Sequence, residues 1–344
     1  MTILHSLGLG MGTQNSNGEW LEVYFPTPCM NPSENLASAI SDVVDYQGGN
    51  AVIALSDSQL NELATSLNDA DEKGMATLAK QLLGSKRPAV VVLLAEDAKP
   101  ESVPEVYLKL QLISHRIAKP HSLNLEGMFG ALPNVAWTNQ GAIDLGELPQ
   151  RQLESRLAGN TLSVDCVDKF PKMTDYVVPA GVRIADTARV RLGAYLGEGT
   201  TIMHEGFVNF NAGTDGPNMV EGRISAGVFI GSGSDLGGGC STMGTLSGGG
   251  NMIISVGKEC LIGANAGIGI PLGDRCTVES GLYITAGTKV AMLDENRQLA
   301  GEAKARDLAG KSDLLFRRNS MTGTVECLTN ESAIALNDAL HAHN

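Results

Sequence analysis

Several features are scarce in this 344-residue chain, and each scarcity excludes a class of protein. Aromatic residues make up only 4% of the chain, and no apolar run approaches the length needed to span a membrane. The formal net charge is −13, which argues against a nucleic-acid-binding protein. The first residues, MTILHSLGLGMGTQ, have neither the basic start nor the long apolar run of a secretion signal. We therefore predict a cytoplasmic protein that binds neither membranes nor nucleic acid.

Motifs with well-known chemistry are also missing. The six cysteines are scattered without CxxC spacing, at Cys29, Cys166, Cys240, Cys260, Cys276 and Cys327. A zinc site is therefore not indicated, and we expect reduced structural thiols. No GxGxxG follows a predicted strand and no GxxxxGKS/T occurs, so the sequence indicates neither a dinucleotide-binding fold nor a P-loop.

The strongest pattern present is an aliphatic residue that returns every six positions between residues 181 and 290. The residues between these positions are mostly glycine, alanine, serine, threonine, asparagine and aspartate. A period of six fits neither an α-helix nor an alternating strand, and it is typical of the hexapeptide repeat of a parallel β-helix. The repeating positions are Ile184, Val190, Leu196, Ile202, Val208, Ile224, Ile230, Leu236, Val256, Ile262, Ile268, Val278, Ile284 and Val290.

The repeat predicts a mainly β fold in which three hexads complete one coil of a triangular prism. Each aliphatic side chain points inward and stacks on its equivalent in the next coil, while glycine and asparagine allow tight corners. Known hexapeptide solenoids are left-handed, and we expect the same handedness here. A β-sandwich with chance spacing is the alternative. The gaps at 209–223 and 237–255 exceed a hexad, so we predict loops that leave the prism and carry function there.

The rest of the chain divides around this repeat. The predicted parts are an N-terminal α/β domain over 1–165, a connector over 166–181, the β-helix with loop insertions over 182–292, and a small C-terminal extension over 293–344. The connector should be exposed because it contains charged residues and proline. In the extension, we predict a basic loop with one or two strands over 305–328 and a capped helix over 330–343.

The N-terminal domain is predicted to be a small sheet covered by helices. Strands are predicted over 20–26, 51–55 and 89–95, and helices are predicted after Ser33, over 60–67, over 75–82, after Pro104 and after Pro149.

The fold and its cations suggest a ligand. Solenoids of this kind commonly associate as trimers, and the groove between neighbouring prisms suits a long, thin ligand such as coenzyme A, which is an analogy from fold. Coenzyme A needs cations for its phosphates. This acidic chain concentrates cations just past the repeat, at Lys304, Arg306, Lys311, Arg317 and Arg318. The plain alternative is a solvated basic patch.

Acyl transfer to an amine also needs a group that takes a proton and a group that stabilises the thioester oxyanion. In the segment MVEGRISAG, Glu221 and Arg223 lie two residues apart, and on an extended strand they would face the same side. Arg223 would then bind an acyl carboxylate while Glu221 faces the amine, or the two would simply form an ion pair. His204 is the rival base.

Several segments together resemble one enzyme family, the longer bacterial form of tetrahydrodipicolinate N-succinyltransferase. Any hexad alone would indicate only a solenoid, whereas the joint occurrence of these strings is specific. They are DKFPKMTDYVVPAGVRIAD (168–186), MHEGFVNFNAGT (203–214), MVEGRISAG (219–227), GSDLGGGCSTMGTLSGGG (233–250), LIGANAGIGIPLGD (261–274), GLYITAGTKV (281–290) and LLFRRNS (314–320).

The resemblance implies transfer of succinyl from succinyl-CoA, a co-substrate, to the amine of ring-opened tetrahydrodipicolinate, on the diaminopimelate route to lysine. Glu221 matches the family's catalytic carboxylate, acting either as an acyl-anhydride nucleophile or as a general base. The positions that match succinyl-CoA contacts are Arg223, Gly238, Ser241, Ala264, Glu279, Ser280, Gly287, Lys304, Arg317, Arg318, Asn319 and Ser320.

The resemblance also implies a homotrimer with sites between subunits and a structural Mg²⁺ on the threefold axis. Glu205 matches one metal ligand, while Ala188 occupies the position of the second acidic ligand, which departs from the family pattern. One carboxylate from each of three subunits could still hold a hydrated cation.

Two other functions compete with succinyl transfer. Acetyl transfer to the same acceptor is the related enzyme reaction, and a basic residue such as Arg223 favours the four-carbon acid instead. A non-catalytic solenoid is the different class, and carbonic anhydrase chemistry would need three histidines around zinc. Only His204 lies in the repeat, so that chemistry is poorly supported.

Overall fold

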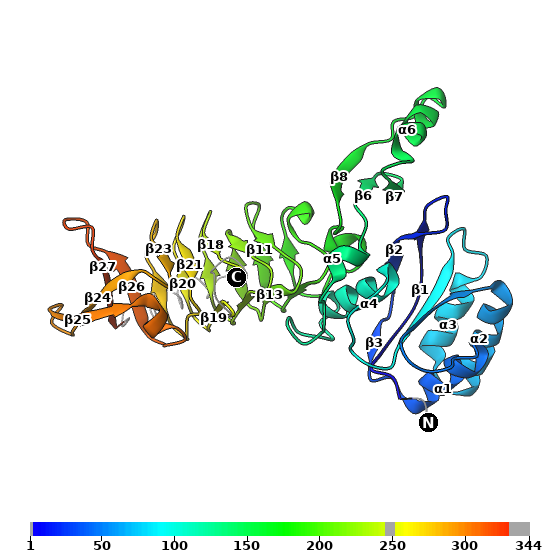
Figure 1. Ribbon diagram of the computed structural model, residues 1–344, viewed down its shortest axis with the longest axis horizontal. Helices are drawn as coiled ribbons and strands as arrows, with labels where there is room; N and C mark the ends of the chain where they lie inside the picture. The colour runs from blue at the N-terminus through cyan, green and yellow to red at the C-terminus, as the bar shows by residue number, and fades with distance from the viewer. Residues whose placement is uncertain (1–2, 245–251, 330–344) are drawn as a thin grey trace. The chain divides into compact units, whose positions relative to one another are not determined.

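The chain forms two compact units (Figure 1). This computed structural model describes residues 3–244 and 252–329. Unit 1 comprises Met1–Ala118 and Ser122–Pro171, and unit 2 comprises Lys119–His121 and Lys172–Asn344. The helix predicted over 330–343 lies outside the described residues. None of the helices that are described is both long and apolar enough to cross a membrane.

Unit 1 contains two sheets and the main helices. The strands are β1 (Ser6–Gln14), β2 (Trp20–Tyr24), β3 (Cys29–Met30), β4 (Ala51–Leu55), β5 (Ala89–Leu94), β6 (Val135–Thr138), β7 (Gly141–Asp144) and β8 (Val164–Asp168). The helices are α1 (Glu34–Val43), α2 (Asp57–Asp69), α3 (Lys73–Leu82), α4 (Val103–Ser114), α5 (Met128–Ala131) and α6 (Leu148–Leu157).

The larger sheet has the strand order β2-β1-β5-β4, and its pairings are antiparallel. Helices α1, α2 and α3 pack on the face that carries Leu7, Leu9 and Val91, as Figure 1 shows. Every strand and helix predicted for this region is present. Ser33 caps α1 as expected, because its side chain accepts a hydrogen bond from the Leu36 backbone N–H.

Strand β1 was not predicted, although it lies in the middle of this sheet. Its sequence, SLGLGMGTQ, places glycine at alternate positions where a strand usually has large side chains. A Cβ on Gly8 would lie 2.7 Å from the Phe25 ring, and a Cβ on Gly10 would lie 2.9 Å from the Phe25 ring. Glycine is therefore needed because Phe25 packs directly against the backbone of the strand.

Unit 2 is a parallel β-helix with three sheets, as the six-residue repeat predicted. Sheet one contains β9 (Arg183–Ile184), β11 (Thr200–Ile202), β14 (Asn218–Val220), β17 (Asp235–Leu236), β20 (Leu261–Ile262), β22 (Thr277–Val278) and β26 (Leu314–Arg318). Sheet two contains β12 (Phe207–Val208), β15 (Arg223–Ile224), β18 (Ser241–Thr242), β21 (Gly267–Gly269) and β23 (Tyr283–Thr285). Sheet three contains β10 (Ala194–Leu196), β13 (Ala212–Thr214), β16 (Phe229–Ile230) and β19 (Ser255–Val256).

The predicted aliphatic positions stack in register from coil to coil. In sheet one, for example, Ile202 pairs with Val220, and Leu236 pairs with Ile262. Apart from Ile184, which is partly buried, these side chains are almost completely buried, and together they form one continuous core. Burying one such side chain stabilises the fold by about 1.5–3 kcal/mol, so the repeat supplies much of the stability of this unit.

The first of the two predicted loop insertions is wrong, because residues 209–223 do not leave the prism but form β13 and β14. In the second, over 237–255, β18 continues the coil, while residues 245–251 lie outside the described residues. Two threonines explain the error, because Thr214 and Thr242 occupy inward positions and are fully buried. The Thr214 hydroxyl hydrogen-bonds to the Thr200 hydroxyl at 2.8 Å, which satisfies both polar groups inside the core.

The remaining elements of unit 2 follow or precede the coils. They are β24 (Lys289–Leu293), β25 (Leu299–Lys304), β27 (Val325–Thr329) and the short 3-10 turns Met173–Asp175, Thr187–Arg189 and Ala305–Leu308. The strands β26 and β27 confirm the prediction of one or two strands over 305–328. The predicted connector is not wholly exposed, because Met173 is fully buried in the core of the β-helix.

We expect the thiols of this protein to differ sharply in reactivity. No disulfide joins the cysteines within the described residues, and Cys166 is exposed. Burial raises the pKa of Cys240 and of Cys327 to about 12, so almost no thiolate forms there near neutral pH. Iodoacetamide should modify Cys166 long before those two, as measured by peptide mass spectrometry. Equal rates in the native protein would contradict this burial, and the denatured protein is the control.

Candidate active site

Glu221 lies in a corner of the β-helix, directly after β14. Its backbone N–H donates to the Leu236 carbonyl at 2.8 Å, and its carbonyl accepts from the Gly239 N–H at 3.3 Å. The neighbouring coil therefore fixes the backbone of Glu221, while the side chain is half-buried. No residue in the described part of the chain forms a hydrogen bond or an ion pair with its carboxylate. This carboxylate is available to a substrate.

Arg223 begins β15, and its side chain is held by the next coil. Its Nε and Nη2 donate to the Ser241 Oγ at 3.1 Å and 2.7 Å, and Ser241 is its partner in the strand register. Ser241 is buried, whereas Arg223 is exposed. One hydroxyl thus orients one side of the guanidinium, which leaves its other donors for an anionic group.

One expectation about this pair is wrong, and one of its two alternative arrangements is absent. Glu221 and Arg223 do not lie on one extended strand, because the chain bends at Gly222 between the two sheets. They also form no ion pair with each other among the residues that the structure describes. The bend therefore places the Glu221 carboxylate, which has no partner among the described residues, and the Arg223 guanidinium, which Ser241 holds on one side, at the same corner.

Glycine is required at this corner by close packing. A Cβ on Gly222 would overlap the Cys240 Sγ and would lie 2.7 Å from the Cys240 carbonyl oxygen. A Cβ on Gly238 would lie 3.4 Å from the Glu221 Oε2. Gly238, a predicted acyl-donor contact, therefore lies beside the carboxylate.

His204 and Glu205 lie one coil before Glu221 and in the same corner. The His204 Nδ1 is 3.0 Å from the Glu205 Oε1, and the Arg189 Nη2 is 3.4 Å from the Glu205 Oε2. Both oxygens of Glu205 are thus engaged within the chain. His204, the rival base, has a partner of its own.

Within one chain, the described residues assemble no magnesium site of the kind that the resemblance implied. Among them, no group of three or more histidine, cysteine, aspartate or glutamate side chains could hold a metal ion. The cation beside Glu205 is Arg189, and Ala188 offers no ligand oxygen in its side chain. A hard divalent cation needs several oxygen ligands, so no step derived below uses a metal.

Other predicted acyl-donor contacts meet around β26, at the end of the coils. The Glu279 N–H donates to the Phe316 carbonyl at 2.9 Å, and the Glu279 Oε2 accepts from the Arg318 N–H at 2.7 Å. Ser280 packs on the preceding coil, where its Oγ lies 2.8 Å from the position of a Cβ on Gly263. Ala264 accepts from the N–H of Gly281 at 2.8 Å. Residues far apart in sequence are thereby brought together.

A carboxylate that sequence reasoning missed, Glu326, organises two of these contacts. The Arg317 Nε lies 2.8 Å from the Glu326 Oε2, and the Asn319 Nδ2 donates to the Glu326 Oε1 at 2.8 Å. Arg317 and Glu326 are direct cross-strand partners on β26 and β27. The sequence did contain a signal for this pair. Arg317 and Glu326 carry opposite charges on two predicted strands that are joined by the turn after Asn319.

The remaining predicted contacts are exposed. Gly287 lies in the turn after β23, where an added Cβ would meet nothing within 4 Å. Lys304 and Ser320 are also exposed, and Lys304 forms no ion pair with any described residue. Arg318 donates from Nη1 only to the Gly323 carbonyl, at 3.3 Å. Lys304 and Arg318 are therefore cations without an acidic partner in the described part of the chain.

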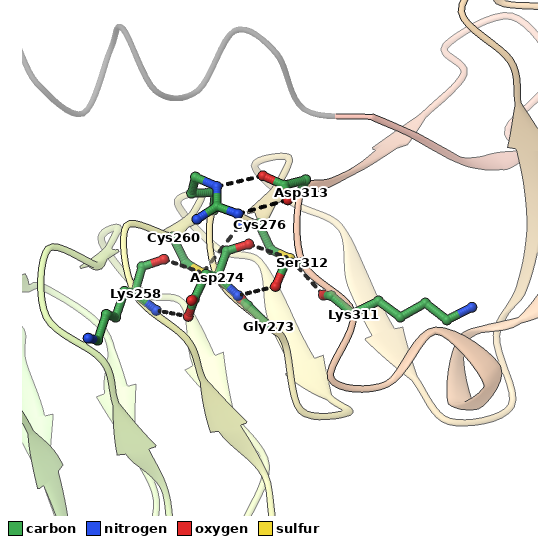
Figure 2. A network of polar contacts seen from close by, with 9 residues as sticks. Lys258, Cys260, Gly273, Asp274, Cys276, Lys311, Ser312 and Asp313 are labelled. Atoms are coloured by element: carbon green, nitrogen blue, oxygen red, sulfur yellow. Dashed lines mark hydrogen bonds and ion pairs between the residues drawn. The ribbon is translucent and has the colours of Figure 1, made fainter.

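A polar network pins the segment before β26 to the coils (Figure 2). The Arg275 Nε and Nη2 donate to the two carboxylate oxygens of Asp313 at 2.6 Å and 2.9 Å. The Asp274 N–H donates to the Ser312 Oγ at 3.0 Å, and the Asp274 Oδ1 accepts from the Lys258 N–H at 2.8 Å. The segment that leads into Arg317 and Arg318 is thus attached at a defined place.

We expect Glu326 to make the C-terminal strands sensitive to acid. The hydrogen bond from Asn319, and then that from Arg317, holds the pKa of Glu326 below its ordinary value of 4.5. A lowered folded-state pKa means that Glu326 stabilises the fold above about pH 4.5 and that this stabilisation is lost as pH falls through the lowered pKa. The thermal midpoint of the wild type should therefore fall more on acidification than that of Glu326→Gln. The exposed Glu302→Gln variant is the control, and equal pH slopes would contradict the role of Glu326.

Comparison with known proteins shows which family the chain resembles. Residues 75–130 and 132–172 match the N-terminal and middle parts of the family described as tetrahydrodipicolinate N-succinyltransferase, and residues 253–286 match the hexapeptide repeat of succinyl-transferase. The 2,3,4,5-tetrahydropyridine-2,6-dicarboxylate N-succinyltransferases of Pseudomonas putida and Vibrio cholerae are similar along their whole length. The first is 67% identical over 341 residues, covering 99% of each chain, and the second is 60% identical over 339 residues, covering 98% of this chain and 99% of that one.

A solved structure shares the fold. It is the crystal structure of a Campylobacter jejuni protein assigned as a 2,3,4,5-tetrahydropyridine-2-carboxylate N-succinyltransferase, with a TM-score of 0.88 and 32% identity, covering 96% of this chain and 93% of that one. The β-helix and its repeat define a hexapeptide-repeat transferase. More closely, the chain belongs to the tetrahydrodipicolinate N-succinyltransferase family, which confirms the resemblance seen in its motifs.

Proposed function

We propose that this protein transfers succinyl from succinyl-CoA to the amine of ring-opened tetrahydrodipicolinate, on the route to diaminopimelate and lysine. The names of the full-length relatives support this reaction. The observation that carries it is the Glu221 carboxylate, which has no partner among the described residues and lies two residues from a guanidinium with donors to spare.

In the simpler mechanism, Glu221 accepts a proton from the ammonium group of the acceptor. The amine nitrogen then attacks the thioester carbonyl carbon, the carbon–sulfur bond breaks, and coenzyme A leaves as a thiolate that takes up the proton lost by the attacking nitrogen. In the alternative, the Glu221 carboxylate attacks the thioester and forms a mixed anhydride as coenzyme A leaves. The amine then attacks the anhydride and regenerates Glu221. Both mechanisms yield the same amide.

Arg223 is proposed to bind the far carboxylate of the succinyl group, since its guanidinium is exposed and oriented by Ser241. The proposed acyl-donor contacts are Arg223, Gly238, Ser241, Ala264, Glu279, Ser280, Gly287, Lys304, Arg317, Arg318, Asn319 and Ser320. Arg317 acts within the network of Glu326, whereas the cations Lys304 and Arg318 are available to the phosphates of coenzyme A.

The proposal includes an assembly and a division of labour. We expect a left-handed β-helix that forms a homotrimer in the cytoplasm, with each site between two subunits. We assign catalysis and binding of the acyl donor to the β-helix over 182–292 and to the extension over 293–344, the same parts that were predicted from the sequence.

Free thiol release tests the proposed reaction. The protein is incubated with succinyl-CoA and either tetrahydrodipicolinate or the open-chain analogue 2-aminopimelate, and coenzyme A is followed with a thiol reagent. We expect release that depends on both substrates. Absence of release with succinyl-CoA would refute the proposal, and release with acetyl-CoA only would replace it by acetyl transfer.

A further inference from the structure

One exposed aromatic residue lies on the same face of the β-helix as the proposed succinyl site. The outer side of sheet two carries, in consecutive register, Phe207, Arg223, Ser241, Gly267 and Tyr283, a row that we call the outer ladder. The side chain of Tyr283 is 46% exposed. Its hydroxyl has no hydrogen-bond partner among the described residues.

The Tyr283 ring lies across the backbone of the neighbouring coil. A Cβ on Gly267 would overlap the edge of the ring, and would lie 2.5 Å from its Cζ atom. Gly267 itself is buried, so the ring covers its peptide. Glycine is needed at this position, because the Cβ of any other residue would collide with the ring where it packs against the strand. The ring is therefore fixed on one face and open to solvent on the other.

The outer ladder has a cation near one end and an aromatic ring at the other. Neighbouring strands are about 4.8 Å apart, so three steps separate Arg223 from Tyr283 by roughly 14 Å. Between them lie Ser241, which holds the Arg223 guanidinium, and Gly267, which the Tyr283 ring covers, so the cation and the ring occupy neighbouring steps of the ladder. An extended ligand with an anion at one end would contact both.

Tyr283 also lies between proposed donor contacts in the sequence. Ser280 precedes it and Gly287 follows it, and both are on the same coil or its following turn. The ladder thus connects the coenzyme end of the proposed site with the succinyl end. The pantetheine arm of the acyl donor must cross this distance, and a tyrosine offers it a large apolar face together with a polar hydroxyl.

We propose that Tyr283 binds the pantetheine arm of the acyl donor, with its ring as the contact surface and its hydroxyl as a hydrogen-bonding group. This role rests on the proposed function, and it adds a residue that neither the motifs nor the family resemblance assigned. Tyr283 contributes to binding of the donor and not to the chemical step, because it lies far along the ladder from Glu221.

The experiment separates binding from catalysis. Tyr283→Ala and Tyr283→Leu should raise the KM for succinyl-CoA about tenfold, which corresponds to about 1.4 kcal/mol, with kcat nearly unchanged. Tyr283→Phe keeps the ring and should raise KM only about two- to threefold. Leu299→Ala, which removes a side chain that is 66% exposed on β25, is the matched control and should change neither constant.

Calorimetric titration with coenzyme A is the second measurement, because it does not depend on turnover. A Kd and a KM that stay at wild-type values in Tyr283→Leu would overturn the role of Tyr283 while leaving the proposed reaction intact. A fall in kcat at constant KM, or a lowered thermal midpoint that Tyr283→Phe does not restore, would show a structural role and would overturn it too. If the wild type releases no thiol, the reaction fails, and the titration still decides whether Tyr283 binds coenzyme A.

Discussion

Replacing Glu221 with glutamine should lower kcat by about 10²–10⁴-fold, the usual contribution of general acid–base catalysis. Glutamine has nearly the same shape but cannot accept the proton or attack the thioester. Because the described residues make no hydrogen bond or ion pair with the Glu221 carboxylate, the substitution breaks no contact and should leave stability nearly unchanged. Steady-state kinetics with succinyl-CoA and 2-aminopimelate, together with a thermal midpoint, measure both effects.

His204→Gln is the control for this experiment. His204 lies one coil before Glu221 and hydrogen-bonds to its neighbour Glu205, so its replacement should leave most of the turnover. If Glu221→Gln stayed active and His204→Gln did not, the roles of the two residues would be reversed.

A burst experiment then separates the two mechanisms for Glu221. The enzyme is mixed with succinyl-CoA alone, the released coenzyme A is measured, and the protein is freed of succinyl-CoA before hydroxylamine is added. A mixed anhydride would release up to one coenzyme A per site, and hydroxylamine would then give a hydroxamate by attack at either carbonyl, that of Glu221 or that of the succinyl group. General-base catalysis predicts neither product without the acceptor, since the amine is the nucleophile.

Gly222→Ala should destabilise the β-helix by about 1–3 kcal/mol, the usual cost of overpacking, and should lower activity as well. The added methyl group would overlap the Cys240 Sγ and lie 2.7 Å from the Cys240 carbonyl oxygen. That carbonyl accepts a hydrogen bond from the Arg223 N–H at 2.8 Å, so it cannot move without disturbing the corner. Glu221 and Arg223 flank the strained residue and would both shift. Differential scanning calorimetry and kinetics measure the two losses.

Gly301→Ala is the matched control. Gly301 lies on β25 in the same unit, and a Cβ there would meet nothing within 4 Å. It should leave the unfolding transition and the activity unchanged. If both variants kept wild-type stability and activity, the corner at Gly222 would accommodate the added methyl group without loss of stability, which would contradict the prediction.

The fold was readable from the sequence where apolar side chains repeat. Each hexad needs one inward residue, and isoleucine, valine or leucine at that position identifies it. The inward positions at Thr214 and Thr242 were missed, because a threonine can be buried when its hydroxyl is hydrogen-bonded, and hydropathy does not record that. Strand β1 was missed for a related reason, since its glycines reflect the closeness of Phe25 and not flexibility.

The candidate site was predictable only in part. The motifs identified Glu221 and Arg223, but the bend between them depends on how the coils turn, which their spacing does not reveal. Glu326 was missed as the partner of Arg317 because it lies on the other side of a turn. Only the register of the two strands places the two side chains opposite each other. Tyr283 was missed because its importance comes from neighbours on other coils, and only the folded chain places them side by side.

The C-terminal strands have a consequence for solubility. A stack of parallel strands ends in unpaired backbone groups, which invite another chain to add on and polymerise. In sheet one, β26 covers the last coil strand, β27 covers β26 in the antiparallel direction, and β24 and β25 continue outward. The outermost strand carries exposed charges at Glu302 and Lys304, which discourage further pairing. The segment proposed to hold coenzyme A is thus also the cap that prevents aggregation, so shortening it should cost both properties together.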